Sequence, residues 1–145
     1  MEPATTECVC TTLRMTTRWI DRLYSQALGE AGLRPTNYAF LARLAADGPL
    51  TVSQLADRLA MERTTCTREL KPLAQAGLLA IEAGEDRRRR VVRLTPEGEA
   101  KLAEARPLWE AVQERVATAF GGGSVDDLLG MLRGLLLDTQ QLTAR

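Results

Sequence analysis

Apolar residues recur every three or four positions along most of this chain, which is the pattern of amphipathic α-helices. The first such segment runs from about residue 11 to residue 28, and Gly29 and Gly32 are expected to end it. Thr36 is expected to cap a second helix, which the Gly48-Pro49 pair stops. The first third of the chain is therefore predicted to contain two helices.

Two closely spaced helical segments follow. Thr51 and Gln54 have the T-x-x-Q spacing of a capping box, so a third helix is predicted to begin at Thr51. After a break near Ala60-Met61, a fourth helix is predicted to begin around Glu62, a weak cap, and to end at Gly77. Two short helices joined by a tight turn are typical of a helix-turn-helix.

The pattern then changes to alternation. Residues 78–83 and 90–94 are predicted to form two short β-strands, which the turn at 84–89 joins into a hairpin. Thr95-Pro96-Glu97 is typical of a helix start, with a cap, a proline at the first helical position and an acid in the first turn. A long fifth helix is therefore predicted after the hairpin.

The last two predicted helices carry continuous apolar seams. The glycines at 121–123 are expected to end the fifth helix, and Ser124 with Asp127 to begin the sixth. Intervals that alternate between three and four favour packing against another helix. The seam positions are Leu102, Ala105, Trp109, Val112, Val116 and Ala119 in the fifth helix, and Leu128, Leu132, Leu135, Leu136 and Leu142 in the sixth.

Composition narrows the classes of function. The 145 residues, 45% apolar and 26% charged, fit one soluble globular domain. No stretch approaches the roughly 20 apolar residues of a membrane span, and the N-terminus lacks signal-peptide features, so we expect a cytoplasmic protein with three free thiols and no membrane partner. Because there is no histidine, nucleophile–base pair, phosphate loop or ligand cluster, we expect no enzyme, no metal and no cofactor.

The net charge is zero, but positive charge is concentrated in the middle of the chain. Residues 62–95 hold eight basic and five acidic side chains, whereas residues 96–145 hold five and eight. Four arginines, 87–90, stand at the tip of the predicted hairpin. Such a run repels itself unless a polyanion neutralises it, and DNA phosphates or a narrow minor groove would do so. A solvated charge run is the alternative, but a hairpin directly after a candidate recognition helix favours DNA.

The predicted fourth helix divides into two faces at 100° per residue. Cys66, Leu70 and Leu73 fall on the face expected to be buried. Pro72 removes an amide donor to the Arg68 carbonyl and is expected to bend the helix. The other face can bond base edges and phosphates, although a merely solvated face is the alternative. That face contains Thr64, Arg68, Lys71 and Gln75, with Thr65 and Thr67 on its flanks.

Over almost its whole length the chain resembles the MarR family of winged helix-turn-helix repressors. Residues 85–98, EDRRRRVVRLTPEG, are similar to the family's wing motif, D-x-R followed by V-x-L-T-x-x-G. Residues 51–79 resemble its helix-turn-helix. The resemblance implies that Arg88 enters the minor groove and that Asp86 braces it. The expected DNA-binding residues are Arg63, Thr64, Thr65, Thr67, Arg68, Lys71, Asp86, Arg87, Arg88, Arg89 and Arg90.

The resemblance also implies the organisation of the chain. The expected fold is mainly α, a winged helix-turn-helix with a two-stranded β wing and N- and C-terminal dimerisation helices. Residues 1–145 would form one domain, with the DNA-binding lobe at 33–95 and the dimerisation helices at 1–32 and 96–145. The expected partners are a second copy of the chain and a pseudo-palindromic double-stranded DNA operator. A dimerisation module that does not bind DNA is the alternative, but it leaves the arginine tip unexplained.

Members of this family often bind small phenolic or aromatic anions between the dimer helices and the DNA-binding lobes. The resemblance therefore implies a repressor that such an effector releases from its operator. Ordinary core or interface packing is the alternative for each candidate side chain. The aromatic residues that would line this site are Trp19, Tyr24, Tyr38, Phe40 and Trp109.

Oxidation of a cysteine is the other expected signal. Cys10 lies near the start of the first helix, where the helix dipole favours a thiolate. Cys10, Leu13 and Tyr24 resemble the family's organic-peroxide sensors, although Pro35 stands where those sensors have another tyrosine. The expected chemistry is a sulfenic acid at Cys10 that a thiol such as Cys8 caps. An inert Cys10, or a soft-metal or arsenite site at Cys8 and Cys10, are the alternatives.

Overall fold

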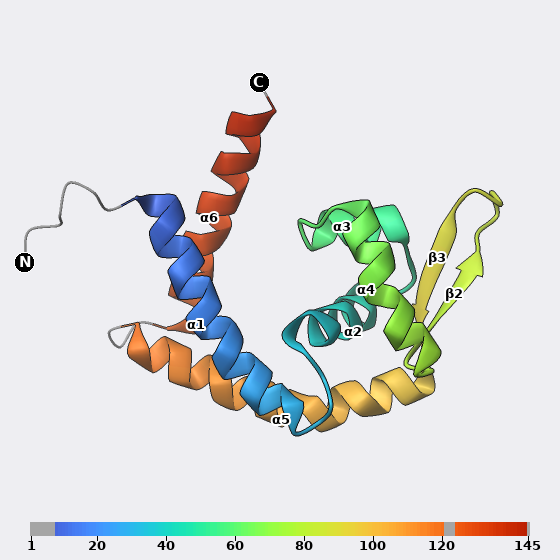
Figure 1. The fold of residues 1–145 in the computed structure, drawn as a ribbon, viewed down its shortest axis with the longest axis horizontal. Coiled ribbons are helices and arrows are strands. Elements are labelled where there is room, and N and C mark those ends of the chain that lie inside the picture. Colours follow the sequence, from blue (N-terminus) through green and yellow to red (C-terminus); the bar gives the residue numbers. More distant parts are fainter. Residues whose placement is uncertain (1–7, 121–123, 145) are drawn as a thin grey trace, which may run out of the picture. The chain divides into compact units, whose positions relative to one another are not determined.

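The computed structural model describes residues 8–120 and 124–144. The chain divides into two compact units, Met1–Leu108 and Trp109–Arg145, and helix α5 crosses the boundary between them. Figure 1 shows the elements in order: α1 (Val9–Gly29), α2 (Pro35–Asp47), β1 (Leu50–Thr51), α3 (Val52–Arg58), α4 (Arg63–Gln75), β2 (Leu79–Ala83), β3 (Arg90–Leu94), α5 (Pro96–Ala119) and α6 (Val125–Thr143). The mainly α fold with a β wing is the one expected from the sequence.

The start of α2 differs from the prediction. Thr36 is not the cap, because the helix already begins at Pro35 and Arg34 is its N-cap residue. Proline fits the first helical position, since its missing amide would have no partner there and its φ is already helical. A proline that precedes a threonine thus moved the start of the helix forward by one residue.

Two other helix starts form as predicted. The Thr51 hydroxyl accepts from the Gln54 amide at 3.1 Å, and the Gln54 side chain accepts from the Thr51 amide at 2.9 Å. Ser124 and Asp127 form the same reciprocal pair at the start of α6, at 3.1 and 3.3 Å. Glu62, a weak cap by its sequence, makes no side-chain capping bond to α4. The glycines at 121–123, predicted to end α5, lie outside the described residues.

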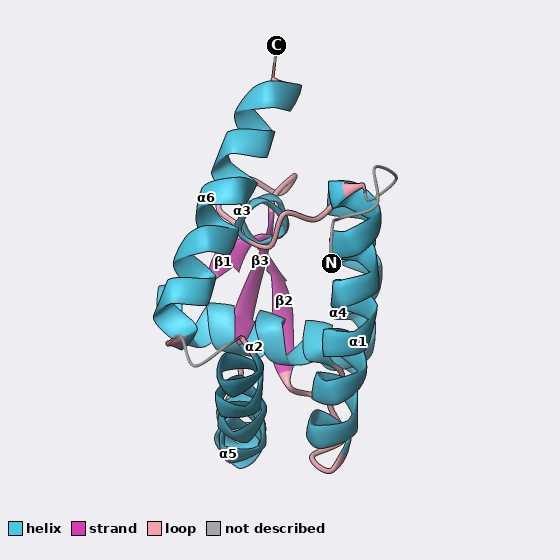
Figure 2. Ribbon diagram, turned by 90° about the vertical axis from the view of Figure 1, so that its left-hand side faces the viewer, coloured by secondary structure: helices cyan, strands magenta, loops and turns pink. Residues whose placement is uncertain are grey.

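The hairpin is part of a three-stranded antiparallel sheet. β3 lies between β1 and β2, as Figure 2 shows, and Val92 pairs with Leu50 on one side and with Ile81 on the other. The hairpin of β2 and β3 was predicted, but β1 was not. A strand of two residues is too short for alternation to reveal it, and it forms because β3 offers an edge beside the start of α3.

Every helix of the first unit contributes to a core of fully or nearly fully buried apolar side chains. Burying one such aliphatic or aromatic side chain stabilises the fold by roughly 1.5–3 kcal/mol. The apolar face predicted for α4 lies in this core, which fixes the direction of its other face. The core includes Leu28, Phe40, Leu41, Leu44, Leu55, Cys66, Leu70, Leu73, Leu79, Val92 and Leu102.

The T-P-E-G segment joins α5 to the end of α4. The Thr95 hydroxyl accepts from the Gly98 amide at 3.0 Å and donates to the Gly77 carbonyl at 2.7 Å. The Thr95 amide donates to the Leu78 carbonyl at 3.3 Å. A Cβ atom at Gly98 would overlap that same carbonyl oxygen, so only glycine fits. The first turn of α5 is therefore fixed to the turn between α4 and β2.

The C-terminal unit leaves much apolar surface uncovered. Trp109 is half-buried and Val112 is buried, whereas α6 has no buried residue. Along the described residues no helix is both apolar and long enough to cross a membrane. In this unit and on α1, the exposed large apolar side chains are Val9, Leu13, Met15, Trp19, Phe120, Met131, Leu132, Leu135, Leu136, Leu137 and Leu142.

Candidate nucleic-acid interface

Helix α4 presents a polar face because its other face is anchored. Cys66 is fully buried, and its Sγ donates to the Val52 carbonyl of α3 at 3.8 Å. α4 continues through Pro72 as one helix, and the Ala76 amide donates to the Pro72 carbonyl at 2.9 Å. Most of the predicted contact residues on this helix are exposed, and only Thr65 is half-buried. The exposed ones are Arg63, Thr64, Thr67, Arg68 and Lys71.

Asp86 holds the turn at the tip of the wing. Its carboxylate accepts from the Arg88 amide at 3.1 Å, and its carbonyl accepts from the Arg89 amide at 2.8 Å. The Gly84 amide donates to the Arg89 carbonyl at 2.7 Å and closes the turn. An aspartate that bonds the backbone two residues on is a common way to stabilise a turn. The brace implied by the resemblance therefore acts on the backbone of Arg88.

The arginines of the wing tip are exposed and uncompensated. Arg87, Arg88, Arg89 and Arg90 form no ion pair with any residue that the structure describes. Arg93, on the same strand, does pair with Glu82 at 3.8 Å. The unpaired guanidinium groups therefore produce a local positive potential in a chain of zero net charge.

Two cavities connect the wing to the helix-turn-helix. The first, about 320 Å³, is lined by Ser53 and Gln54 at the start of α3 and by Arg63 and the wing arginines 88–90. The second, about 700 Å³, lies between α4 and the wing and includes Lys71 and Arg90 in its lining. The two predicted clusters are thus parts of one surface. Sequence reasoning missed Ser53, because the distance from α3 to the wing depends on tertiary packing.

The aromatic residues proposed as an effector site occupy different environments. Phe40 is fully buried in the core. Trp19 is exposed, with the Arg22 guanidinium carbon 4.6 Å from the centre of its ring. Tyr24 is half-buried and Tyr38 is buried. Burial, followed by the nearby Tyr38 phenol, raises the pKa of Tyr24, which indicates that these two phenols are close.

The three cysteines differ in the same way. Cys8 is exposed and is the N-cap residue of α1, where the Thr11 amide, the Cys10 amide and the Thr11 hydroxyl lower the pKa of its thiol. Cys10 is exposed in the first turn. Burial raises the pKa of Cys66, whose predicted place in the core is confirmed. Cys8, rather than the expected Cys10, is thus the thiol on which the helix start acts.

No group of three histidine, cysteine, aspartate or glutamate side chains is arranged to hold a metal ion among residues 8–120 and 124–144. The acidic side chains of α5 are solvated, as Lys101 and Glu104 illustrate with an exposed pair at 2.8 Å. The chemistry of this surface is therefore that of guanidinium, ammonium, hydroxyl and amide groups.

Comparison with known proteins agrees with this arrangement. A family described as a helix-turn-helix domain matches residues 33–82. Over 92 residues the chain is 32% identical to YwoH of Bacillus subtilis (strain 168), an uncharacterized HTH-type transcriptional regulator, with 63% of this chain and 67% of YwoH covered. The matched part includes the anchored α4, so the likeness covers the elements that form the polar surface.

Solved structures extend the likeness to nearly the whole chain. The M. tuberculosis transcriptional regulator MosR, in complex with DNA, is 34% identical with a TM-score of 0.85, covering 94% of this chain and 98% of MosR. MarR from E. coli, complexed with operator DNA, has the same fold at 20% identity, with a TM-score of 0.75 and coverage of 90% and 92%. On its helix order, its wing and these relatives, the chain belongs to the MarR family of winged helix-turn-helix transcriptional regulators.

Proposed function

We propose that this protein is a homodimeric repressor that binds a pseudo-palindromic double-stranded DNA operator through α4 and the wing. The observation that carries the proposal is the exposed, unpaired arginine tip beside the anchored polar face of α4. In the major groove, Thr64 and Arg68 would bond base edges and phosphates. Arg88, held by Asp86, would enter the adjacent minor groove.

The dimer is proposed from the apolar surface that one copy leaves exposed on α1 and α6. A second copy supplies the same apolar surface, and a two-fold axis then makes both patches complementary. In this organisation residues 33–95 form the DNA-binding lobe, and residues 1–32 and 96–145 contain the dimerisation helices. Two lobes related by symmetry would read half-sites about one helical turn apart.

Fluorescence anisotropy against the DNA upstream of the protein's own gene, or against a duplex selected from a random pool, tests this proposal. If the dimer neutralises about six to ten phosphates, the logarithm of the affinity falls with the logarithm of the salt concentration at a slope of roughly −5 to −9. A slope near zero contradicts DNA binding. A dimer that ignores duplex DNA at low salt would instead be a dimerisation module.

We infer further that oxidation of Cys8 releases the operator. The support is its exposure together with the lowered pKa that the Thr11 and Cys10 amides produce, because the thiolate is the nucleophile. The thiolate attacks one oxygen of an organic hydroperoxide, the O–O bond breaks, and a sulfenic acid and, after proton uptake, an alcohol form. The Cys10 thiol then condenses with the sulfenic acid, giving a disulfide and water. Because Cys10 belongs to the first turn of α1, this bond would disturb that turn.

Operator binding before and after addition of an organic hydroperoxide tests the redox input. The wild type is expected to lose binding, whereas Cys8→Ser keeps it and Cys66→Ser, the buried control, behaves as the wild type. If Cys8→Ser and the wild type respond alike, Cys8 is not the sensor. A small phenolic anion bound beside Tyr24 and Tyr38 is then the second candidate, and salicylate is the probe. Arsenite in place of peroxide tests the C-x-C alternative.

A further inference from the structure

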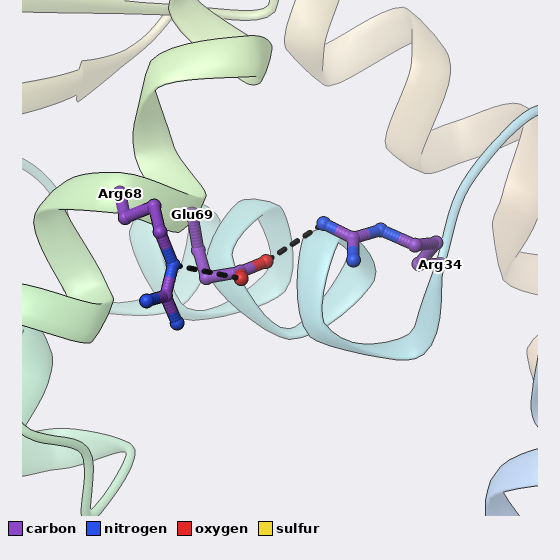
Figure 3. A network of polar contacts seen from close by, with 3 residues as sticks. All are labelled: Arg34, Arg68 and Glu69. Carbon is purple, nitrogen blue, oxygen red and sulfur yellow. Dashed lines mark hydrogen bonds and ion pairs between the residues drawn. The ribbon is translucent and has the colours of Figure 1, made fainter.

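A carboxylate on α4 joins two arginines from different parts of the chain. Glu69 Oε2 lies 2.7 Å from Nη2 of Arg34, the residue that precedes α2. Glu69 Oε1 lies 3.9 Å from Nε of Arg68, its neighbour on α4. Figure 3 shows the carboxylate between the two guanidinium groups. Because Arg34 and Arg68 share one carboxylate, their guanidinium groups lie close together.

The environment of these groups argues against a purely structural pair. The side chain of Glu69 is 20% exposed, whereas those of Arg34 and Arg68 are 62% and 73% exposed. Ion pairs with such exposed partners contribute little to stability. A guanidinium group has five N–H donors, and the Arg34 contact to Glu69 joins only Nη2 to it. Most of the donors of Arg34 therefore remain available to an external acceptor.

The pair lies on the flank of α4 that faces away from the wing. Thr67 and Ala74 line the cavity between α4 and the wing. At 100° per residue, Glu69 projects roughly 140–160° away from both of them. Arg68, which Glu69 also contacts, belongs to the exposed face proposed to enter the major groove. Arg34 therefore extends the positive surface on the side opposite the wing arginines.

We propose that Arg34 contacts a DNA phosphate at the edge of the major groove opposite the wing, and that Glu69 is a positioning residue that orients Arg34 and Arg68. This inference rests on the proposed DNA-binding function. Arginine binds phosphate through parallel N–H donors, and a fixed guanidinium gains more from that geometry than a free one. The wing and Arg34 then hold α4 from both flanks.

Arg34→Gln tests the phosphate contact, with Arg43→Gln as the matched control. Arg43 is also an α2 residue paired with a carboxylate, Asp47, at 3.7 Å, and it lies roughly 13 Å further along the helix. Anisotropy is measured over a salt series on a selected duplex and on a random-sequence duplex. Arg34→Gln is expected to weaken binding to both duplexes by the same factor. It is also expected to make the log–log salt slope shallower by about one per protomer, whereas Arg43→Gln leaves the slope unchanged.

Glu69→Gln tests the positioning role, because it keeps the shape of the side chain and removes its charge. It is expected to strengthen binding to the random duplex, since a negative charge near DNA is lost, and to weaken binding to the selected duplex, since Arg68 and Arg34 lose their orientation. The ratio of the two affinities therefore falls. Circular dichroism melting curves of each variant confirm that the fold is intact.

The outcomes separate the two proposals. If the wild type binds duplex DNA with a steep salt slope but Arg34→Gln matches Arg43→Gln, the phosphate contact is refuted while the proposed function stands. If Glu69→Gln strengthens binding to both duplexes equally, Glu69 is only a repulsive charge and the positioning role is refuted. If the wild type does not bind duplex DNA, the proposed function itself has failed.

Discussion

Helices α4 and α6 have similar patterns in the sequence but opposite surfaces in the structure. α4 buries Cys66, Leu70 and Leu73 in its own chain, so the surface that it leaves exposed is polar and basic. α6 buries no residue, so the surface that it leaves exposed is rich in leucine. The periodicity shows that each helix has an apolar side, but only burial shows whether that side has found its partner. α4 is thus prepared for a polar ligand and α6 for an apolar one.

The largest expected effect comes from making α6 polar. Leu132 and Leu136 lie one turn apart on the exposed apolar side, and the double substitution Leu132→Glu with Leu136→Glu would place charges where a second copy packs. The dimer is expected to dissociate, which analytical ultracentrifugation measures. Operator affinity should fall about 10²–10⁴-fold, because the two lobes no longer bind as one unit.

Gln141→Glu is the matched control for this double variant, since it adds negative charge on the opposite side of α6. It is expected to leave both the dimer and operator binding unchanged. A double variant that remains dimeric would show that α6 is not part of the interface.

The buried side of α4 should respond in stability rather than in association. Leu70 is fully buried, and Leu70→Ala is expected to lower the free energy of unfolding by about 2–5 kcal/mol, because a cavity replaces packed side chain. Urea denaturation at fixed protein concentration measures it. Thr64→Ala, on the exposed side, should change stability by less than about 0.5 kcal/mol. Equal effects of the two substitutions would contradict the orientation of α4.

The wing should respond in affinity with little change in stability. Arg88→Ala is expected to cost about 1–3 kcal/mol of binding free energy, roughly a 5- to 150-fold loss, because an exposed, unpaired guanidinium is removed from its DNA contact. Operator titration measures this loss, and thermal melting checks the fold. Arg93→Ala, which removes an arginine already paired with Glu82, should have a smaller effect. The reverse ranking would contradict the role given to the tip.

The smallest expected effect is a shift in a pH profile. Alkylation by iodoacetamide proceeds through the thiolate, and the amides of Thr11 and Cys10 lower the pKa of Cys8. In a Cys10→Ser variant, alkylation of Cys8 should therefore rise with pH at a midpoint below that of an ordinary cysteine. Cys66, whose pKa burial raises, should react only after unfolding. A Cys8 midpoint at or above the ordinary value would remove the support for its role as sensor.

Local patterns predicted most of the fold, because helix periodicity, capping boxes and strand alternation depend on residues close in sequence. The faces of α4 and the basic wing followed from the same rules. The pair of Arg34 and Glu69 did not, because 35 positions separate these residues and only the packing of α2 against α4 brings them together. Cys8 was passed over for Cys10 because its role depends on the exact first residue of α1, which a pattern defines only to within one or two positions.

The joint at Thr95 and Gly98 has a mechanical consequence. Three hydrogen bonds and the absence of space for a Cβ atom leave the first turn of α5 no freedom to slide against the loop that follows α4. A tilt of this helix is therefore not absorbed at its base but is transmitted, as by a lever, to the recognition helix and the wing. An inducer that moves α5 would in this way change the reach of both DNA-binding elements without touching either of them.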